Sequence, residues 1–283
     1  MTPGAWATSF AVDPARPDHL LLATSSLSGL WKPKDDLGGP WESWDGGKTW
    51  KQLREGLDDD GKPRRNWNRG TVAAMDSSTG LLFYGAEGLG LFARQALDPK
   101  SKKPDTPPVW VDISPPIPTP RINAFLLRPI EGDGGTEVIV QIEGENDTRT
   151  FVRTLASTVL ARLTAAEEDE AAAAPLWTDL PDPPTRLGSL VADPHISGRL
   201  LATGRDGGAG VLAFGVPGAQ PSVPPSEGPA PAEEEAGPPP PDGLLAFTSG
   251  ADGQVRVWSM AEGKVLSSLP GSTKEVLALA LSP

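Results

Sequence analysis

The chain of 283 residues contains no cysteine, only two histidines, one tyrosine and three methionines. Without cysteine it can form no disulfide, no thiolate metal site and no cysteine nucleophile. Its 37 aspartates and glutamates outnumber its 25 lysines and arginines, and a net charge of −12 argues against partners that are nucleic acids or anionic membranes. No run is apolar enough to suggest a membrane span, and the first ten residues lack the pattern of a secretory signal. We therefore expect a soluble, cytoplasmic protein.

Glycine and proline, in contrast, are abundant, with 32 of each. This composition is typical of many short strands joined by many turns. No phosphate-binding loop, dinucleotide fingerprint or zinc-ligand spacing occurs, so the sequence predicts no cofactor and no metal.

Two kinds of internal repeat organise the chain. The segments FAVDPARPDHLLLAT (residues 10–24) and SLVADPHISGRLLATG (189–204) both combine an apolar strand, an Asp-Pro turn and the letters LLAT. A second pattern, W-x-[QD]-[LI], begins at Trp50, Trp110 and Trp177. Alternating short strands with turns at this long period favour radially repeated β-sheets over βαβ units.

These repeats divide the chain into three regions. Residues 1–216 contain four blade-like units, at 6–53, 71–113, 122–180 and from 187 onward, and a short surface helix is predicted within 157–174. Residues 217–242 are rich in proline and glutamate and are expected to be a disordered or extended linker. Residues 243–283 resemble a WD repeat in their Asp252-Gly253 turn and the alternating VRVW that follows it.

The segment SWDGGKTW (43–50) reads S-x-D-x-G-x-T-W and resembles the Asp-box of β-propellers. Proteins with this box include sialidases, xyloglucan hydrolases of two propellers, sortilin-type receptors and photosystem II assembly factors. The resemblance implies a tight hairpin in which an Asp fixes the turn and a Trp packs between sheets. It therefore implies a structural role for Ser43, Asp45, Gly47, Thr49 and Trp50.

Together these features predict an all-β fold, a β-propeller of about five recognisable blades. The final VLALALSP (276–283) looks like the inner strand of one more blade. An unclosed ring would leave exposed strand edges, so the propeller is either incomplete, a fragment of a longer chain, or closed irregularly or by a partner.

Candidate catalytic residues are few. A sialidase-like site would need an arginine triad, a Tyr–Glu pair and an Asp acid/base, but Tyr84 lies in an alternating strand and is expected in the core. Asp13 and Asp193 are interpreted as turn formers. The two histidines, His19 and His195, follow those turns and are expected to face solvent. The sequence therefore assigns no catalytic residue and favours a non-enzymatic protein.

One constellation does suggest binding. Cationic residues stand just before the inner strands of successive units, at Arg69, Arg121, Arg186 and Lys274. Equivalent positions of a propeller gather around one mouth of its channel, so these residues predict a basic ring that would bind an acidic peptide, a carboxylate or a phosphate. The alternative is that loops before strands simply favour solvated cations. If the first long loop folds over this mouth, the patch also gains Arg64, Arg65 and Trp67.

Two functions remain open at this stage. The first is a non-enzymatic protein-interaction platform or sensor module that engages a protein partner through the basic mouth. The second is a glycan-binding or glycoside-hydrolase-like propeller, which would require two close carboxylates in a cleft on the same face.

Overall fold

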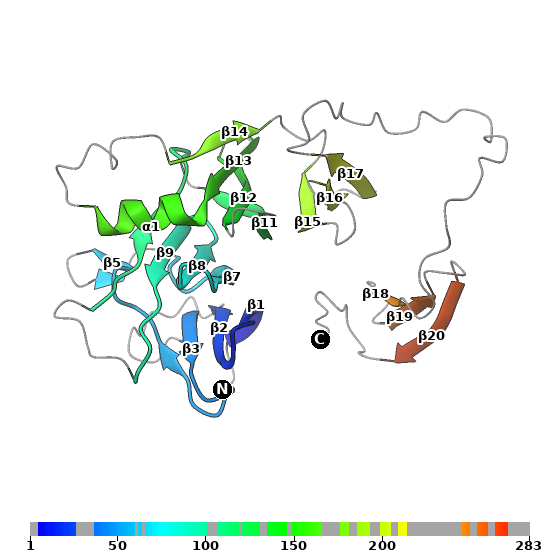
Figure 1. Cartoon of the computed structure of the whole chain (residues 1–283), viewed down its shortest axis with the longest axis horizontal. Coiled ribbons are helices and arrows are strands. Elements are labelled where there is room, and N and C mark those ends of the chain that lie inside the picture. The colour runs from blue at the N-terminus through cyan, green and yellow to red at the C-terminus, as the bar shows by residue number, and fades with distance from the viewer. Residues whose placement is uncertain are drawn as a thin grey trace. The chain divides into compact units, whose positions relative to one another are not determined.

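The computed structural model describes residues 5–26, 37–59, 62–63, 66–100, 107–118, 120–130, 135–145, 149–165, 176–180, 186–192, 199–204, 209–213, 245–249, 254–259 and 264–270 (Figure 1). They belong to two compact units, Met1–Pro224 and Pro225–Pro283. The predicted linker 217–242 and the predicted last strand 276–283 lie outside the described residues.

The first unit is built of consecutive antiparallel sheets. The first sheet has the order β1 (Ala5–Asp13), β2 (Arg16–Ser26), β3 (Gly39–Ser43), β4 (Lys51–Gln52). The second has the chain order β7 (Gly70–Asp76), β8 (Leu81–Ala86), β9 (Gly90–Gln95), β10 (Val111–Asp112). The third has the order β11 (Arg121–Pro129), β12 (Thr136–Glu143), β13 (Arg149–Leu155), β14 (Thr178–Leu180). The fourth sheet consists of β15 (Leu187–Ala192), β16 (Arg199–Gly204) and β17 (Ala209–Ala213).

Three smaller features complete the described chain. A short hairpin pairs β5 (Asp58–Asp59) with β6 (Lys62–Pro63). The helix α1 (Ala156–Thr164) packs against β9, β12 and β13 and buries Ala156 and Val159, so it occupies the first part of the segment predicted as a surface helix. In the second unit, the WD-like region forms the antiparallel meander β18 (Leu245–Ser249), β19 (Gln254–Ser259), β20 (Lys264–Pro270).

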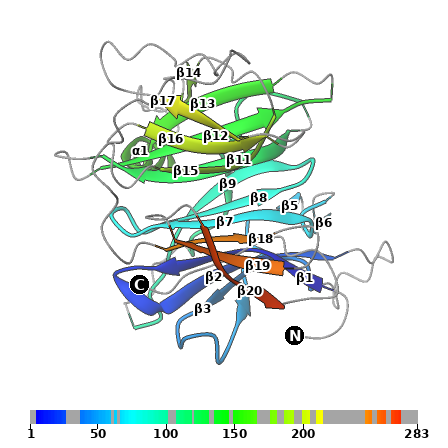
Figure 2. The same ribbon diagram turned by 90° about the vertical axis from the view of Figure 1, so that its right-hand side faces the viewer.

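The first strands of the four sheets lie beside one another, β1 against β7, β7 against β11, and β11 against β15. In Figure 2 the first, second and third sheets follow one another in chain order, and the fourth overlaps the third in this view. Successive antiparallel meanders whose first strands face a common centre are the blades of a β-propeller. The predicted all-β propeller class is therefore confirmed.

The core lies between these sheets. Strand β8 is buried along its whole length, because Leu82 and Tyr84 pack toward the first sheet while Leu81 and Phe83 pack toward the third. A strand covered on both faces carries a continuous apolar run, here LLFYGA. A further cluster joins Phe151 of the third sheet to neighbours in the fourth.

The repeated tryptophans join one blade to the next. The Trp110 indole Nε1–H donates to the Leu53 carbonyl oxygen at 3.0 Å, and the Trp177 Nε1–H donates to the Ile113 carbonyl oxygen at 2.6 Å. Leu53 and Ile113 are the final residues of the preceding W-x-[QD]-[LI] motifs. In both cases, therefore, the Trp before the fourth strand of one blade donates to the residue just after the fourth strand of the preceding blade.

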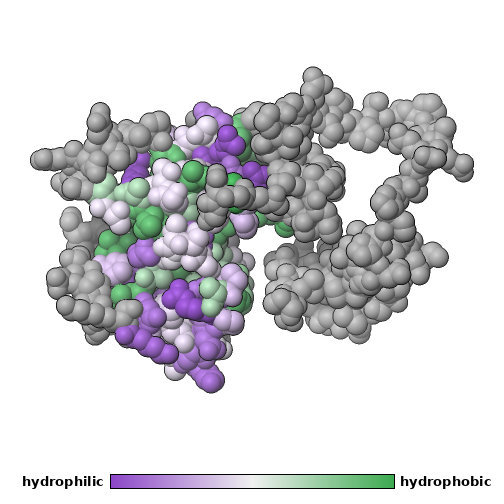
Figure 3. All heavy atoms as spheres, in the orientation of Figure 1, coloured by the Kyte–Doolittle hydropathy of each residue, from purple (hydrophilic) through white to green (hydrophobic). Residues whose placement is uncertain are grey.

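Polar and apolar side chains are interspersed on the face drawn in Figure 3, and the hydrophilic ones are densest near β2 and β3. Among the described residues, no helix is long and apolar enough to cross a membrane.

Candidate functional site

Arginines from three successive blades line one cavity of about 370 Å³. Arg69 immediately precedes β7, Arg121 is the first residue of β11, and Arg186 immediately precedes β15. Three of the four predicted cations therefore meet at the start of the inner strands, whereas Lys274, Arg64 and Arg65 lie outside the described residues. We call this site the mouth cavity; its charged lining is Arg69, Arg121, Arg186, Glu87, Glu143 and Glu145.

The three glutamates change the electrostatics of the mouth cavity. Glu87 and Glu143 each stand at the end of a second strand and before a glycine, in AEG and IEG. Their backbones lie opposite the arginines of their own blades, since the Glu87 N–H donates to the Arg69 carbonyl oxygen at 2.9 Å and Glu143 pairs with Arg121 in the sheet. The cavity lining is charge-balanced rather than uniformly basic. The repeated Glu-Gly pair was the available sequence signal for these residues.

Each of these two glutamates forms an ion pair with the arginine of the next blade. Glu87 Oε1 lies 3.4 Å from Arg121 Nη2, and Glu143 lies in close contact with Arg186 Nη2. Glu87 also lies 3.8 Å from Arg69 Nη1 through its second oxygen. Glu143 is almost fully buried and its second oxygen accepts a 3.0 Å hydrogen bond from Asn123 Nδ2. The mouth cavity therefore contains one tight pair and two looser ones.

Trp67 does not belong to the mouth cavity, contrary to the expectation that it would enlarge the basic patch. Its side chain is only 3% exposed and packs in the core with Leu53 and Leu57. Its carbonyl oxygen accepts a 2.6 Å hydrogen bond from the Tyr84 hydroxyl, which is itself fully buried. Tyr84 therefore has the expected core role.

The Asp-box residues form a hydrogen-bonded turn between β3 and β4. Asp45 accepts hydrogen bonds from the Thr49 N–H at 2.8 Å and the Thr49 hydroxyl at 2.6 Å, while Ser43 Oγ donates to Asp45 and accepts from the Gly47 N–H. Gly47 has a φ of +85°, which favours glycine, and its carbonyl oxygen accepts from Trp50 Nε1 at 2.9 Å. These hydrogen bonds of Thr49 and Ser43 lower the pKa of Asp45 to about 2.

The Asp-box and the mouth cavity lie at opposite ends of the first sheet. The Gly46 N–H in the box donates to the Asp18 carbonyl oxygen near the start of β2, whereas Arg69 forms a β-bridge with Ser25 near its end. The box therefore cannot contribute side chains to the mouth cavity.

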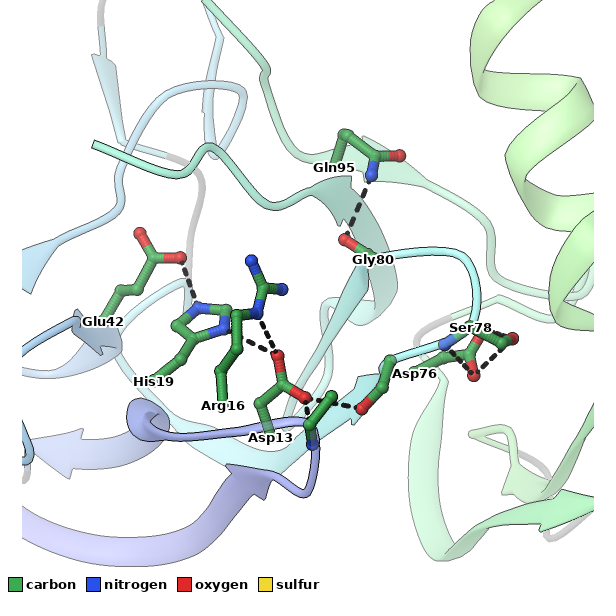
Figure 4. Close-up of polar contacts among 10 residues, drawn as sticks. Asp13, Arg16, His19, Glu42, Asp76, Ser78, Gly80 and Gln95 are labelled. Carbon is green, nitrogen blue, oxygen red and sulfur yellow. Dashed lines mark hydrogen bonds and ion pairs between the residues drawn. The ribbon is translucent and has the colours of Figure 1, made fainter. Parts of the chain in front are cut away.

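His19 is the clearest departure from the sequence expectations, because it is buried rather than facing solvent. Its Nδ1 lies 3.3 Å from Asp13 Oδ2 and its Nε2 lies 3.0 Å from Glu42 Oε1 (Figure 4). The ring also stacks on Trp44 at 3.6 Å between centroids. Two carboxylates on opposite edges and an indole on one face compensate for the removal of the imidazole from water. The side chain is 1% exposed, so it does not face solvent.

Asp13 connects this cluster to the next blade. Its Oδ2 accepts from Arg16 Nε (Figure 4). Its Oδ1 accepts from the Ala15 N–H and from the hydroxyl of Ser77, in the turn that follows β7. Burial alone would raise the Asp13 pKa, but the hydrogen bonds from Ser77, Arg16, His19 and Ala15 outweigh it and hold the pKa at about 2.

Asp76 repeats this arrangement one blade further on. It accepts from Ser78 and Thr79 in its own turn and, at 2.8 Å, from the Thr136 hydroxyl of the third sheet. Burial opposes ionisation, yet the hydroxyls of Thr79, Thr136 and Ser78 lower its pKa. Asp13 is thus a turn former, as predicted, and both aspartates also join adjacent blades. Asp193 and His195, in the fourth blade, lie outside the described residues.

Within the described ranges, no group of three or more His, Asp or Glu side chains is placed to hold a metal ion. No protein-family model matches the chain, and no curated protein matches it. Among solved structures, the chain is similar to one described as "Structure of Dos1 propeller", with 13% identity and a TM-score of 0.43, over 95% of this chain and 75% of that chain.

Proposed function

We propose that this protein is a non-enzymatic β-propeller that acts as a protein-interaction platform or sensor module. Its mouth cavity engages an acidic peptide segment of a partner protein. The observation that carries the proposal is the convergence of Arg69, Arg121 and Arg186, from three blades, on one cavity. Arginine forms planar, bidentate contacts with carboxylates, so a set of guanidiniums on rigid strands suits such a ligand.

The net charge of the chain gives this cavity selectivity. A molecule of charge −12 repels acidic peptides over most of its surface, and binding is favoured only where guanidiniums are exposed. Arg69 and Arg121 meet that condition, with side chains 45% and 50% exposed. The mouth cavity therefore both attracts an acidic peptide and determines where on the molecule it binds.

The test is binding of a fluorescein-labelled hexaglutamate peptide to the full chain, followed by fluorescence anisotropy. Arg121→Glu should reduce affinity at least tenfold at low salt, because it replaces an exposed cation of the cavity with an anion. Arg162→Glu is the matched control, since Arg162 is an exposed arginine on α1 and the substitution makes the same change in net charge. Equal loss of affinity in the two variants, or no binding by the native chain, would refute the proposal.

A second candidate function is glycan binding, because three carboxylates, Glu87, Glu143 and Glu145, line the same cavity. Hydrolysis of the sialidase type is disfavoured, since Tyr84 is buried and its hydroxyl is bound to the Trp67 carbonyl. A panel of neutral polysaccharides would separate the two candidates: saturable polysaccharide binding without hexaglutamate binding would favour the glycan reading.

We also propose that two of the blades belong to known repeat types. The turn hydrogen bonds of Ser43, Asp45 and Thr49 support an Asp-box blade at the start of the chain. The three-stranded meander β18–β20 supports a WD-repeat-like blade in the second unit. A cytoplasmic location remains a prediction.

A further inference from the structure

Glu87 lies between the two most exposed arginines of the mouth cavity. One of its carboxylate oxygens is 3.4 Å from Arg121 Nη2 and the other is 3.8 Å from Arg69 Nη1. Charge-assisted N–H···O hydrogen bonds are normally about 2.7–2.9 Å long. Neither guanidinium is therefore fully bonded by Glu87, although both are attracted to it.

The pair formed by Arg186 is different. Glu143 contacts Arg186 closely, has only 6% of its side chain exposed, and is held from its other side by Asn123. Releasing Arg186 to a ligand would leave a buried carboxylate without its cation, which is costly. Arg186 is thus committed to the protein, whereas Arg69 and Arg121 are available.

We infer that Glu87 occupies the place of the ligand carboxylate in the unbound protein, and that an acidic side chain of a bound peptide displaces it from Arg69 and Arg121. This inference rests on the proposed function and specifies its anion subsite. In this arrangement Arg69 and Arg121 bind the ligand, Arg186 supports the cavity wall, and Glu87 sets the affinity by competing.

The position of Glu87 allows the exchange without rearrangement of the blade. Its backbone N–H is fixed to the Arg69 carbonyl oxygen, just beyond the last residue of β8. Its side chain is 42% exposed and can rotate toward water, where a carboxylate is well solvated. Only two loose, exposed ion pairs are lost, and the ligand carboxylate replaces them.

Glu145 provides a matched control on the same cavity wall. It is exposed, lines the mouth cavity, and takes part in none of the ion pairs of the described residues at this site. Glu145→Gln removes the same charge as Glu87→Gln from the same cavity, without removing a competitor for Arg69 and Arg121. Comparing the two variants therefore distinguishes removal of the competing Glu87 carboxylate from a general change in the electrostatic potential of the cavity.

The experiment compares hexaglutamate affinities of the native 283-residue chain, Glu87→Gln, Glu145→Gln and Arg121→Glu, with hexaglutamine as the uncharged probe. Glu87→Gln should tighten hexaglutamate binding about three- to tenfold, the range expected when two exposed ion pairs no longer compete. Glu145→Gln should change it less than about twofold, and hexaglutamine should not respond. Thermal melts of all variants confirm that each is folded.

Each contrary result has a distinct meaning. If the native chain binds and Arg121→Glu does not, but Glu87→Gln binds no more tightly than native, Glu87 is not a competitor and the inference fails alone. If Glu145→Gln tightens binding as much as Glu87→Gln, the effect is one of overall charge and the inference again fails alone. If neither the native chain nor Glu87→Gln binds hexaglutamate, the proposed function fails together with it.

Discussion

Asp13→Asn tests whether the polar contacts at the β1–β2 turn hold the first two blades together. Asparagine keeps the shape of the side chain and one oxygen, so the Ala15 N–H and the Ser77 hydroxyl can still donate to it. The other oxygen becomes an NH₂ group that faces Arg16 Nε–H, a donor that cannot become an acceptor. The substitution therefore replaces an attraction with a repulsion at a position that is 1% exposed.

Two lines of reasoning give the same expected loss of stability for Asp13→Asn. The Asp13 pKa is about 2 in the folded chain, against an ordinary value of 3.8. Each unit of difference corresponds to about 1.4 kcal/mol, so the ionised carboxylate contributes roughly 2 kcal/mol to the free energy of unfolding at neutral pH. Loss of a hydrogen bond to a charged group costs about 1.5–3 kcal/mol. We therefore expect Asp13→Asn to lower stability by about 2 kcal/mol.

The pH dependence follows from the direction of the shift. Because the folded-state pKa lies below the unfolded value, the unfolded chain takes up a proton first as the solution is acidified. The contribution of Asp13 is therefore fully present above about pH 5, about half of it remains at pH 3, and little is left near pH 2. The stability difference between the native chain and Asp13→Asn should narrow in the same way.

Guanidinium unfolding at pH 7 and at pH 3, followed by tryptophan fluorescence, measures this difference. Asp18→Asn is the control, since Asp18 is an exposed aspartate of the neighbouring sequence and should cost less than about 0.5 kcal/mol. Ser77→Ala removes only the hydroxyl from the second blade and should cost about 1 kcal/mol. A cost below 0.5 kcal/mol for Asp13→Asn at pH 7, or a cost that does not shrink by pH 3, would refute the reasoning.

Two further substitutions test the packing between blades. Trp110→Phe should lower the free energy of unfolding by about 2–4 kcal/mol in the same assay, because it leaves the buried Leu53 carbonyl without its donor and opens a void. Trp6→Phe is the control: this side chain is 53% exposed, so the free energy of unfolding should change little. Equal effects of the two substitutions would contradict this account. Gly56→Ala should lower the melting temperature by several degrees or prevent folding, because φ is +90° and the added methyl would lie 2.3 Å from the Trp110 carbonyl oxygen. Gly135→Ala is the control: the added methyl would lie 4.0 Å from its nearest neighbouring atom, so this variant should melt like the native chain.

Local pattern is enough to predict the blades, because their strands and turns are encoded by neighbouring residues. The W-x-[QD]-[LI] repeats at Trp50, Trp110 and Trp177 correspond to β4, β10 and β14. Their hydrogen bonds to the preceding blade are not visible in the sequence, since the donor and acceptor are about 60 residues apart. The period reveals that a unit repeats, but it does not show which atoms meet across the boundary.

The wrong prediction for His19 and the glutamates missed in the mouth cavity have the same physical origin. His19 follows a turn, and residues after a turn are usually exposed. It is buried because Glu42 and Trp44 reach it from β3 and the turn that follows, which a local pattern cannot indicate. Likewise, the spacing of Arg69 and Arg121 places them at equivalent points, whereas their shared partner Glu87 comes from another strand end.

The two ends of the blades differ in how completely their charged groups are bonded. At the turn end, Asp13 accepts from Ala15, Arg16 and Ser77, lies 3.3 Å from His19 Nδ1 and is buried, so it has no remaining capacity for a ligand. At the mouth end, Arg69 and Arg121 share a single exposed carboxylate at distances longer than a good hydrogen bond. A ligand anion gains little binding free energy where the protein's donors already bond to its own carboxylates. It gains most where donors such as those of Arg69 and Arg121 are incompletely bonded. For this reason the turn end should respond to substitution with changes in stability, and the mouth end with changes in binding.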